Sequence, residues 1–268
     1  MKVKPKKSLG QHFLHNEAIA QRIAEALVVD GGVLNTLEVG CGTGALTRHL
    51  LERKDLCVKG IEIDEESIAY LRLNLPAIMP NLYAADFLKI DLRKIFPEGE
   101  FAVIGNFPYN ISSQIFFKIL DYRESVPQVV GMLQKEVAER LASGPGNKSY
   151  GILSVLLQAW YDIEYLFTVG ENEFTPPPKV KSAVIRLRRN SRTELGCDEA
   201  KFKQVVKAAF NQRRKTLRNS LRAIGVDFST QPDGFGRNDT NASLLEKYAT
   251  LRPEQMSVED FIKLTQML

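Results

Sequence analysis

Short apolar runs alternate with helix-like stretches over most of residues 1–190. The apolar runs at 36–40, 57–64, 101–106 and 128–133 have the length and composition of buried strands, and stretches of helical periodicity separate them. This order is typical of βαβ units, in which neighbouring strands are parallel and helices cover the sheet. The sequence therefore predicts an α/β fold with a mostly parallel sheet.

The pattern changes toward the C-terminus. The runs 161–170 and 182–189 resemble an antiparallel pair of strands. We expect no buried strand after Asn190, and the segment 199–224 has helical spacing throughout. We therefore expect two domains: residues 1–192, which contain the sheet and a basic N-terminal arm, and a small, all-helical domain of residues 193–268.

Positive charge is unevenly distributed, although the net charge is only +4. Lys2, Lys4, Lys6 and Lys7 precede the first acidic residue, and the segment 186–222 holds twelve basic residues against three acidic ones. Such segments favour a polyanionic partner. Charge alone fits a solvated basic surface equally well.

The cysteines indicate the compartment. There are three, and they are scattered, which argues against a disulfide framework and for a reducing environment. The chain has no long uncharged apolar run and no secretion signal, and no Cys/His cluster has the spacing of a zinc site. We expect a cytoplasmic protein without a membrane span or a bound metal, and nothing in the pattern requires more than a monomer.

The segment LEVGCGTGALT (37–47) places three glycines between a strand and a helix. Gly40 and Gly42 permit a tight turn and let the backbone approach a ligand. Glu62, at the end of the next strand, is positioned to hold ribose hydroxyls. The same glycines also satisfy a loose dinucleotide pattern, so this loop leaves NAD and S-adenosylmethionine both open.

Two further strand ends carry polar groups. Asp86 ends the third strand, where its carboxylate can accept from the amino group of a cofactor adenine. The fourth strand ends in Asn106-Phe107-Pro108-Tyr109. The Asn106 side-chain oxygen and a backbone carbonyl of Phe107-Pro108 can accept both hydrogens of an aromatic amine and draw its nitrogen toward tetrahedral geometry. Pro108 makes this segment rigid, and Tyr109 offers a ring face to an unstacked base.

The motifs E-x-G-x-G-x-G, E-x-D, A-D-F and N-F-P-Y, in this order, resemble those of adenine-N6 methyltransferases that use S-adenosylmethionine. The resemblance implies a Rossmann-like class I methyltransferase sheet. Such an enzyme needs no side-chain general base, because the leaving thioether is neutral and the methylated nitrogen loses its proton to water. Phe174, in a loop stiffened by three prolines, is expected either to form the opposite wall of the base pocket or to cap the core.

Three longer stretches resemble the KsgA-type 16S ribosomal RNA adenine dimethyltransferases: KKSLGQHFL (6–14), FTPPPKVKSAV (174–184) and FNQRRKTLRNSL (210–221). The resemblance implies dimethylation of N6 in two adjacent adenosines of a hairpin near the 3′ end of 16S rRNA. It also implies that the substrate is the small ribosomal subunit and that the enzyme takes part in assembling it.

The resemblance also assigns residues by motif position. The segment QHFL (11–14) would lie across the cofactor as a partial lid. The cofactor contacts would be His12, Leu14, Gly40, Glu62, Asp86 and Asn106. The RNA phosphate contacts would be Arg213, Arg214, Lys215, Arg218 and Arg222, several of them four residues apart on one helix.

Three alternatives remain. An erythromycin-resistance-type enzyme would methylate 23S rRNA with the same N-F-P-Y segment. A DNA adenine methyltransferase is disfavoured, because no sequence-reading domain is evident. An RNA-binding assembly factor whose methyl transfer is dispensable is disfavoured by the intact glycine loop and N-F-P-Y.

Overall fold

The computed structural model describes residues 3–226, 228 and 239–268. The chain divides into two compact units. The first consists of residues 1–138 and 162–189, and the second of residues 139–161 and 190–268. The structure thus groups residues 139–161 with the helical C-terminal part, whereas the sequence pattern placed them in the sheet domain. The functional division into domains stays a prediction.

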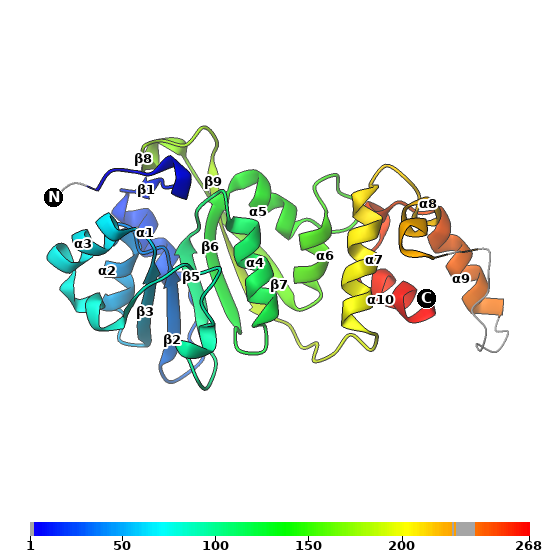
Figure 1. The fold of residues 1–268 in the computed structure, drawn as a ribbon, viewed down its shortest axis with the longest axis horizontal. Coiled ribbons are helices and arrows are strands. Elements are labelled where there is room, and N and C mark those ends of the chain that lie inside the picture. Colours follow the sequence, from blue (N-terminus) through cyan, green and yellow to red (C-terminus); the bar gives the residue numbers. More distant parts are fainter. Residues whose placement is uncertain (1–2, 227, 229–238) are drawn as a thin grey trace. The chain divides into compact units, whose positions relative to one another are not determined.

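The first unit is built on a seven-stranded sheet with the order β4-β3-β2-β5-β6-β9-β7 (Figure 1). The pairs β2–β3, β2–β5, β3–β4 and β5–β6 are parallel, and β9 is antiparallel to β6. The mostly parallel sheet predicted from the sequence is confirmed. The strands are β2 (Leu34–Val39), β3 (Leu56–Glu62), β4 (Leu82–Ala84), β5 (Ala102–Asn106), β6 (Gln128–Gln134), β7 (Tyr161–Val169) and β9 (Ser182–Arg189).

Helices follow the strands, and local capping explains where two of them begin. The Asn16 side chain accepts from the Ile19 amide at the start of α1, and Asp64 accepts from Ser67 at the start of α3. Side chains of this kind satisfy amides that have no partner within the helix. The helices of the first unit are α1 (Glu17–Glu25), α2 (Ala45–Glu52), α3 (Glu65–Asn74) and α4 (Ser112–Asp121), and α5 (Lys135–Ala142) crosses the boundary between the two units.

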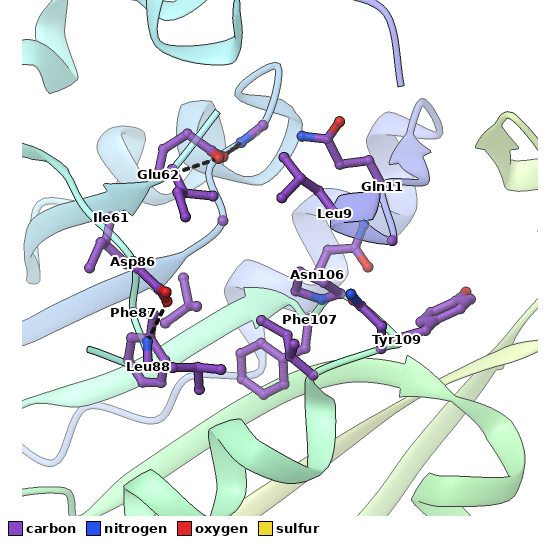
Figure 2. Close-up of a pocket in the computed structure, with 18 of the residues that line it drawn as sticks. Leu9, Gln11, Ile61, Glu62, Asp86, Phe87, Leu88, Asn106, Phe107 and Tyr109 are labelled. Atoms are coloured by element: carbon purple, nitrogen blue, oxygen red, sulfur yellow. Dashed lines mark hydrogen bonds between the residues drawn. The ribbon is translucent and has the colours of Figure 1, made fainter. Parts of the chain in front are cut away.

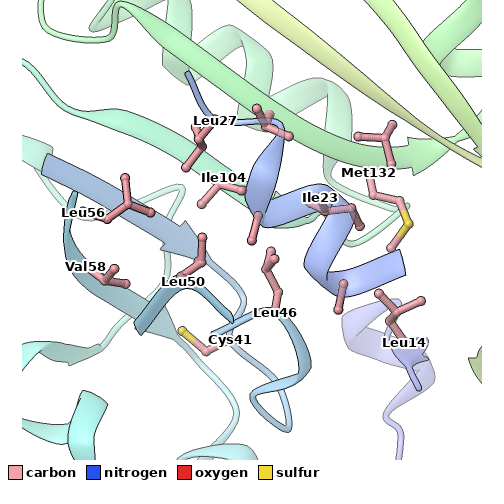
Figure 3. Close-up of a cluster of buried hydrophobic side chains, with 14 of the residues drawn as sticks. Leu14, Ile23, Leu27, Cys41, Leu46, Leu50, Leu56, Val58, Ile104 and Met132 are labelled. Carbon is pink, nitrogen blue, oxygen red and sulfur yellow. The ribbon is translucent and has the colours of Figure 1, made fainter. Parts of the chain in front are cut away.

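A hydrophobic core joins α1 and α2 to the sheet, as Figure 3 shows. Ile23 of α1 and Leu50 of α2 are fully buried, as is Ile104 of β5. Burying a side chain of this size stabilises the fold by about 1.5–3 kcal/mol. This packing holds the carboxyl ends of β2 and β5 in fixed positions.

A second, two-stranded sheet was not predicted. In it, β1 (Phe13–Leu14) pairs antiparallel with β8 (Phe174–Thr175), so that Leu14 lies opposite Phe174. His15 adds a backbone hydrogen bond to Glu173 O at 3.0 Å. The N-terminal segment is thereby joined to the proline-rich loop 176–178.

The second unit is helical. Phe210 contacts the rings of Tyr150 and Phe261, with centroids 6.1 and 5.9 Å apart, in its core. Its helices are α6 (Ile152–Gln158), α7 (Glu199–Asn211), α8 (Leu217–Ser220), α9 (Asp239–Thr250) and α10 (Val258–Met267). Short 3-10 turns occupy residues 7–9, 76–81, 92–94, 171–173, 221–224 and 253–255.

The prediction of one continuous helix over 199–224 is wrong. Helix α7 ends at Asn211, and residues 212–216 form a turn before α8. The Leu217 amide donates to Leu251 O at 2.8 Å, a tertiary contact that replaces a helical one. Phe210 and Leu217 are seven residues apart, a spacing that a single helix would also satisfy, so the apolar pattern did not reveal the break.

None of the helices in the described part of the chain has the length and apolarity needed to cross a membrane.

Candidate active site

A pocket of about 230 Å³ lies at the carboxyl ends of β2, β3 and β5 in the first unit. This edge is where ligands bind in open α/β sheets. Figure 2 shows Glu62 and Asp86 on one side of the pocket and Asn106 and Tyr109 on the other, with Leu9 and Gln11 from the N-terminal segment above them. The pocket therefore collects groups from five separate stretches of sequence.

The glycine loop forms one end of the pocket. Gly40 and Gly42 line it, and both have positive φ angles, of 76° and 54°. Such angles strain any residue with a Cβ. A Cβ on Gly42 would also lie 3.2 Å from the Phe13 ring. The loop thus gives backbone access to a ligand and room for the N-terminal segment beside it.

Glu62 is held by three backbone amides. Its Oε2 accepts from Gly42 N at 2.8 Å, and its Oε1 accepts from Ile63 N and Asp64 N at 2.8 and 2.9 Å. Burial raises the pKa of Glu62, and the three amides act in the opposite direction. A carboxylate has about four acceptor positions, so an acceptor remains for a ligand hydroxyl.

A second carboxyl group, Glu38, is buried behind the glycine loop. It is 1% exposed, and burial raises its pKa to about 7. Its Oε2 and the Thr47 hydroxyl have no hydrogen-bond partner among the described residues. The motif E-x-G-x-G-x-G contains Glu38 but predicts no role for it, because one glutamate in a strand gives no sign of its burial.

Asp86 lies across the pocket from the N-F-P-Y segment. Its Oδ1 accepts from Leu88 N at 2.9 Å, and its Oδ2 lies 3.7 Å from Lys89 Nζ. Ile61, Phe87 and Leu88 supply apolar lining beside it. An apolar slot next to a carboxylate suits a flat ring that carries an amino group.

Asn106 is fixed by the N-terminal segment. Its Nδ2 donates to His12 O at 3.0 Å. A carbonyl oxygen can only accept, so the amide nitrogen must face His12 and the Oδ1 atom is left on the other side. The sequence did not reveal this contact, because every residue carries a backbone carbonyl.

The two aromatic residues of the N-F-P-Y segment, Phe107 and Tyr109, have different environments. Phe107 is fully buried, and a Cβ on Gly131 would lie 2.5 Å from its ring. Tyr109 is only half-buried, and its hydroxyl hydrogen-bonds Ser182 Oγ. The His12 ring is stacked on Tyr109 with centroids 5.2 Å apart. Tyr109 is therefore the aromatic residue of this segment that a ligand can reach.

Two predicted site residues lie elsewhere. Phe174 is 2% exposed and Leu14 is 5% exposed, and both belong to the hydrophobic core cluster. Neither side chain lines the pocket. The expectation that Phe174 forms the opposite wall of the base pocket is thus corrected, because pairing of β8 with β1 turns its ring into the core. The other predicted cofactor and base contacts all line the pocket: His12, Gly40, Gly42, Glu62, Asp86, Asn106, Pro108 and Tyr109.

The basic residues of the second unit differ in their partners. Arg213 lies 3.8 Å from Glu254 and donates to Asn147 O, and Arg218 makes two short hydrogen bonds to Glu246. The remaining three, Arg214, Lys215 and Arg222, are exposed. They do not form the single helical row expected, because Arg213, Arg214 and Lys215 lie in the turn.

The family comparison decides between the cofactors left open by the glycine loop. The model of the family described as ribosomal RNA adenine dimethylase matches residues 2–252. The chain belongs to this family. It is therefore an S-adenosylmethionine-dependent ribosomal RNA adenine dimethyltransferase, as the sequence motifs implied.

Close relatives and solved structures agree with this family. The dimethylase chain is 58% identical over 265 residues to the ribosomal RNA small subunit methyltransferase A of Parabacteroides distasonis, covering 98% of this chain and 93% of the relative. It is 55% identical over 267 residues to the protein of the same name from Cytophaga hutchinsonii, covering 100% and 98%.

A dimethyladenosine transferase from Plasmodium falciparum has a similar structure, with a TM-score of 0.76 at 27% identity over 94% of this chain and 96% of that one. The 23S rRNA methyltransferase ErmE has a TM-score of 0.67, also at 27% identity, over 95% and 99%. The class I methyltransferase fold expected from the motifs is confirmed.

The pocket of this dimethylase fits S-adenosylmethionine. The glycine loop lets the backbone approach the ligand, Glu62 keeps an acceptor for ribose hydroxyls, and Asp86 lies beside an apolar slot suited to adenine. The cofactor supplies an electrophilic methyl group when bound. The assignment of individual contacts stays a prediction.

Proposed function

We propose that this enzyme dimethylates N6 of two adjacent adenosines in a hairpin near the 3′ end of 16S rRNA, acting on the small ribosomal subunit during its assembly. The curated relatives named for the small subunit are 54–58% identical over nearly the whole chain, whereas the 23S enzyme ErmE is 27% identical. This difference favours the small-subunit substrate over the erythromycin-resistance-type alternative. We also propose that the enzyme works as a monomer in the cytoplasm.

The observation that carries the catalytic proposal is the fixed amide of Asn106. Its nitrogen is engaged by His12 O, so its Oδ1 can accept one hydrogen of the adenine amino group. Pro108 O already accepts from Ile111 N at 3.2 Å, which favours Phe107 O as the second acceptor. Two acceptors draw the nitrogen lone pair out of conjugation and aim it at the methyl group. Holding the reacting groups in this geometry supplies most of the rate enhancement.

Tyr109 would hold the flipped base. The His12 ring covers one face of Tyr109 at 5.2 Å, too close for a base between them, so the base would stack on the other face. Stacking of this kind contributes roughly 1–3 kcal/mol per base. Pro108 lines the pocket next to this ring and keeps the segment rigid.

The RNA would be held by phosphate contacts in the second unit. Arg214, Lys215 and Arg222 are exposed and available, whereas Arg213 and Arg218 would exchange carboxylate partners for phosphates. Such contacts fix the orientation of an RNA without reading its sequence. The tertiary structure of the ribosomal particle would then decide which adenosines reach the pocket.

The test is methylation of small and of large ribosomal subunits that lack dimethyladenosine, followed by mass spectrometry of the 16S and 23S rRNAs. We expect two dimethyladenosines in 16S rRNA and a loss of roughly 100-fold or more in rate for Asn106→Ala, because a preorganised hydrogen-bond partner is removed. Asn74→Ala is the matched control, since Asn74 is exposed and its side chain, within the described part of the chain, donates to Tyr70 O of its own helix. Dimethyladenosine in 23S rRNA instead would reject the small-subunit assignment, and an active Asn106→Ala enzyme would reject the role of the amide.

A further inference from the structure

Three motif residues have been given no chemical role so far, although one of them, Gln11, lines the pocket, and the structure brings them together. Lys6 and Gln11 belong to the opening motif KKSLGQHFL, and Asp64 is the aspartate of E-x-D. The Asp64 side chain is fully buried. Lys6 Nζ forms an ion pair with Asp64 Oδ1, and Gln11 Nε2 donates to Asp64 Oδ2 at 3.3 Å. We call this cluster of Lys6, Gln11 and Asp64 the latch.

The hydrogen bonds within the latch fix the orientation of the Gln11 amide and keep Asp64 charged. Gln11 Oε1 accepts from Lys6 N at 2.9 Å, so the Gln11 amide has its oxygen toward the backbone and its nitrogen toward the carboxylate. Asp64 also accepts from Ser67 Oγ at 2.7 Å. Burial alone would raise the pKa of Asp64, but hydrogen bonds from Lys6, Ser67 and Gln11 outweigh it and lower the pKa. The carboxylate therefore stays charged and keeps its attraction for Lys6.

The N-terminal arm, defined here as residues 4–14, connects the latch to the catalytic amide. Gln11 bonds Asp64, and the very next residue, His12, accepts the hydrogen bond from Asn106 Nδ2. Adjacent Cα atoms are about 3.8 Å apart. If the arm moves away from Asp64, His12 O therefore moves as well, and the acceptor for Asn106 Nδ2 is displaced. Residues 8–13 also line the cofactor pocket.

Close packing leaves the arm little freedom between these anchors. Gly10 has a φ of 62°, and a Cβ there would lie 2.5 Å from Asn110 Oδ1. Asn110 Nδ2 in turn donates to Ser8 O at 3.3 Å. The arm therefore contacts both the β3–α3 turn, where Asp64 lies, and the N-F-P-Y segment.

We propose that the latch holds the N-terminal arm in place and thereby fixes the orientation of the Asn106 amide for methyl transfer. Lys6, Gln11 and Asp64 are positioning residues, since their proposed effect on the reaction passes through His12 O, the acceptor for Asn106 Nδ2. Without the latch, the arm would detach. The Asn106 amide would then rotate, and its Oδ1 would no longer face the adenine amino group. This inference rests on the catalytic role proposed above for Asn106.

The test compares Lys6→Met with Lys7→Met. Lys7 is the exposed neighbour of Lys6, so both changes remove one positive charge from the arm. At saturating cofactor, we expect kcat on the ribosomal substrate to fall about 10- to 100-fold for Lys6→Met, because catalysis depends steeply on geometry. Lys7→Met should keep kcat within about twofold, and both should raise KM for RNA alike. Lys6→Arg, which can still pair with Asp64, should recover most of the rate.

Hydrogen exchange tests the latch without measuring activity. Backbone amides of residues 8–14 should exchange faster in Lys6→Met than in Lys7→Met. Because residues 8–13 line the cofactor pocket, calorimetry gives the S-adenosylmethionine affinity of each variant, and kcat is compared at a cofactor concentration that saturates both. A second pair, Asp64→Asn alone and combined with Lys6→Met, should show that the two kcat losses do not add, since both weaken the Lys6–Asp64 ion pair.

Several results would overturn the proposal. Unchanged exchange in Lys6→Met would show that Lys6 does not hold the arm. Faster exchange with unchanged kcat would show that the arm does not position Asn106, as would equal kcat losses in Lys6→Met and Lys7→Met. A wild-type rate for Asn106→Ala would instead refute the role of the amide itself and leave the exchange result standing.

Discussion

The buried carboxyl of Glu38 gives a stability prediction whose sign and size follow from the structure. Its pKa is raised from an ordinary 4.5 to about 7, because burial disfavours the charged form and the nearby Glu62 adds repulsion. An acid whose pKa is higher in the folded state binds more protons there than when unfolded. Stability therefore falls as pH rises from the unfolded pKa to the folded one.

The magnitude follows from the size of the shift. Each pKa unit corresponds to about 1.4 kcal/mol, so the wild-type protein should lose roughly 3 kcal/mol of folding free energy between pH 4.5 and 7 through Glu38 alone. In a chain of this size that is a fall in Tm of roughly 5–10 °C for the unit that contains Glu38. More than about one pH unit below 4.5 or above 7, Glu38 should add no further slope.

The perturbation is Glu38→Gln, which keeps the shape of the side chain and cannot ionise. Calorimetric scans of the wild-type and variant chains between pH 4.5 and 8 give the difference in Tm at each pH. The absolute stability of the variant is not the readout, because a buried amide has its own hydrogen-bonding cost. Glu62 contributes in both proteins, so the change of the difference with pH reports Glu38. Parallel curves of Tm against pH over this range would show that Glu38 does not have a raised pKa in the folded protein.

Other residues give sharper functional outcomes. Glu62→Ala should weaken S-adenosylmethionine binding about 10- to 100-fold in calorimetry, since a charged acceptor is lost; unchanged affinity would exclude Glu62 from the cofactor site. Replacing Arg214 and Lys215 by Ala should reduce the slope of log affinity for RNA against log salt by roughly 1.5, and an unchanged slope would move the RNA surface elsewhere. Gly131→Ala should lower Tm, because its Cβ would lie 2.5 Å from the Phe107 ring, and an unchanged Tm would show that the ring can move.

The parts of the fold that the sequence predicted are those with local signals. The run FAVIGN (101–106) is apolar as a buried strand should be, and strand β5 was found at Ala102–Asn106. The break between α7 and α8 has no such signal, because Arg213–Thr216 are ordinary helix residues in sequence. Only the tertiary hydrogen bond of Leu217 to Leu251 O distinguishes them.

In the candidate site, too, some residues could be found from the sequence and others could not. Glu62, Asp86 and Asn106 could be found because parallel strands bring their carboxyl ends to one edge, whatever the rest of the fold does. The sequence left two positions open for Phe174, because a loop aromatic can face a pocket or the core, and pairing of β8 with β1 decides between them.

The contact between the arm and the amide was beyond sequence reasoning for a more general reason. Asn106 and His12 are 94 residues apart, and the accepting atom is a backbone carbonyl that any residue would supply. The identity of residue 12 therefore does not encode the contact. The sequence does encode the neighbouring contact at Asp64. Lys6 and Gln11 have side-chain donors, and the buried Asp64 carboxylate requires donors because an unpaired buried charge is costly. It follows that Lys6→Met should lower kcat at saturating cofactor, although Lys6 does not line the pocket.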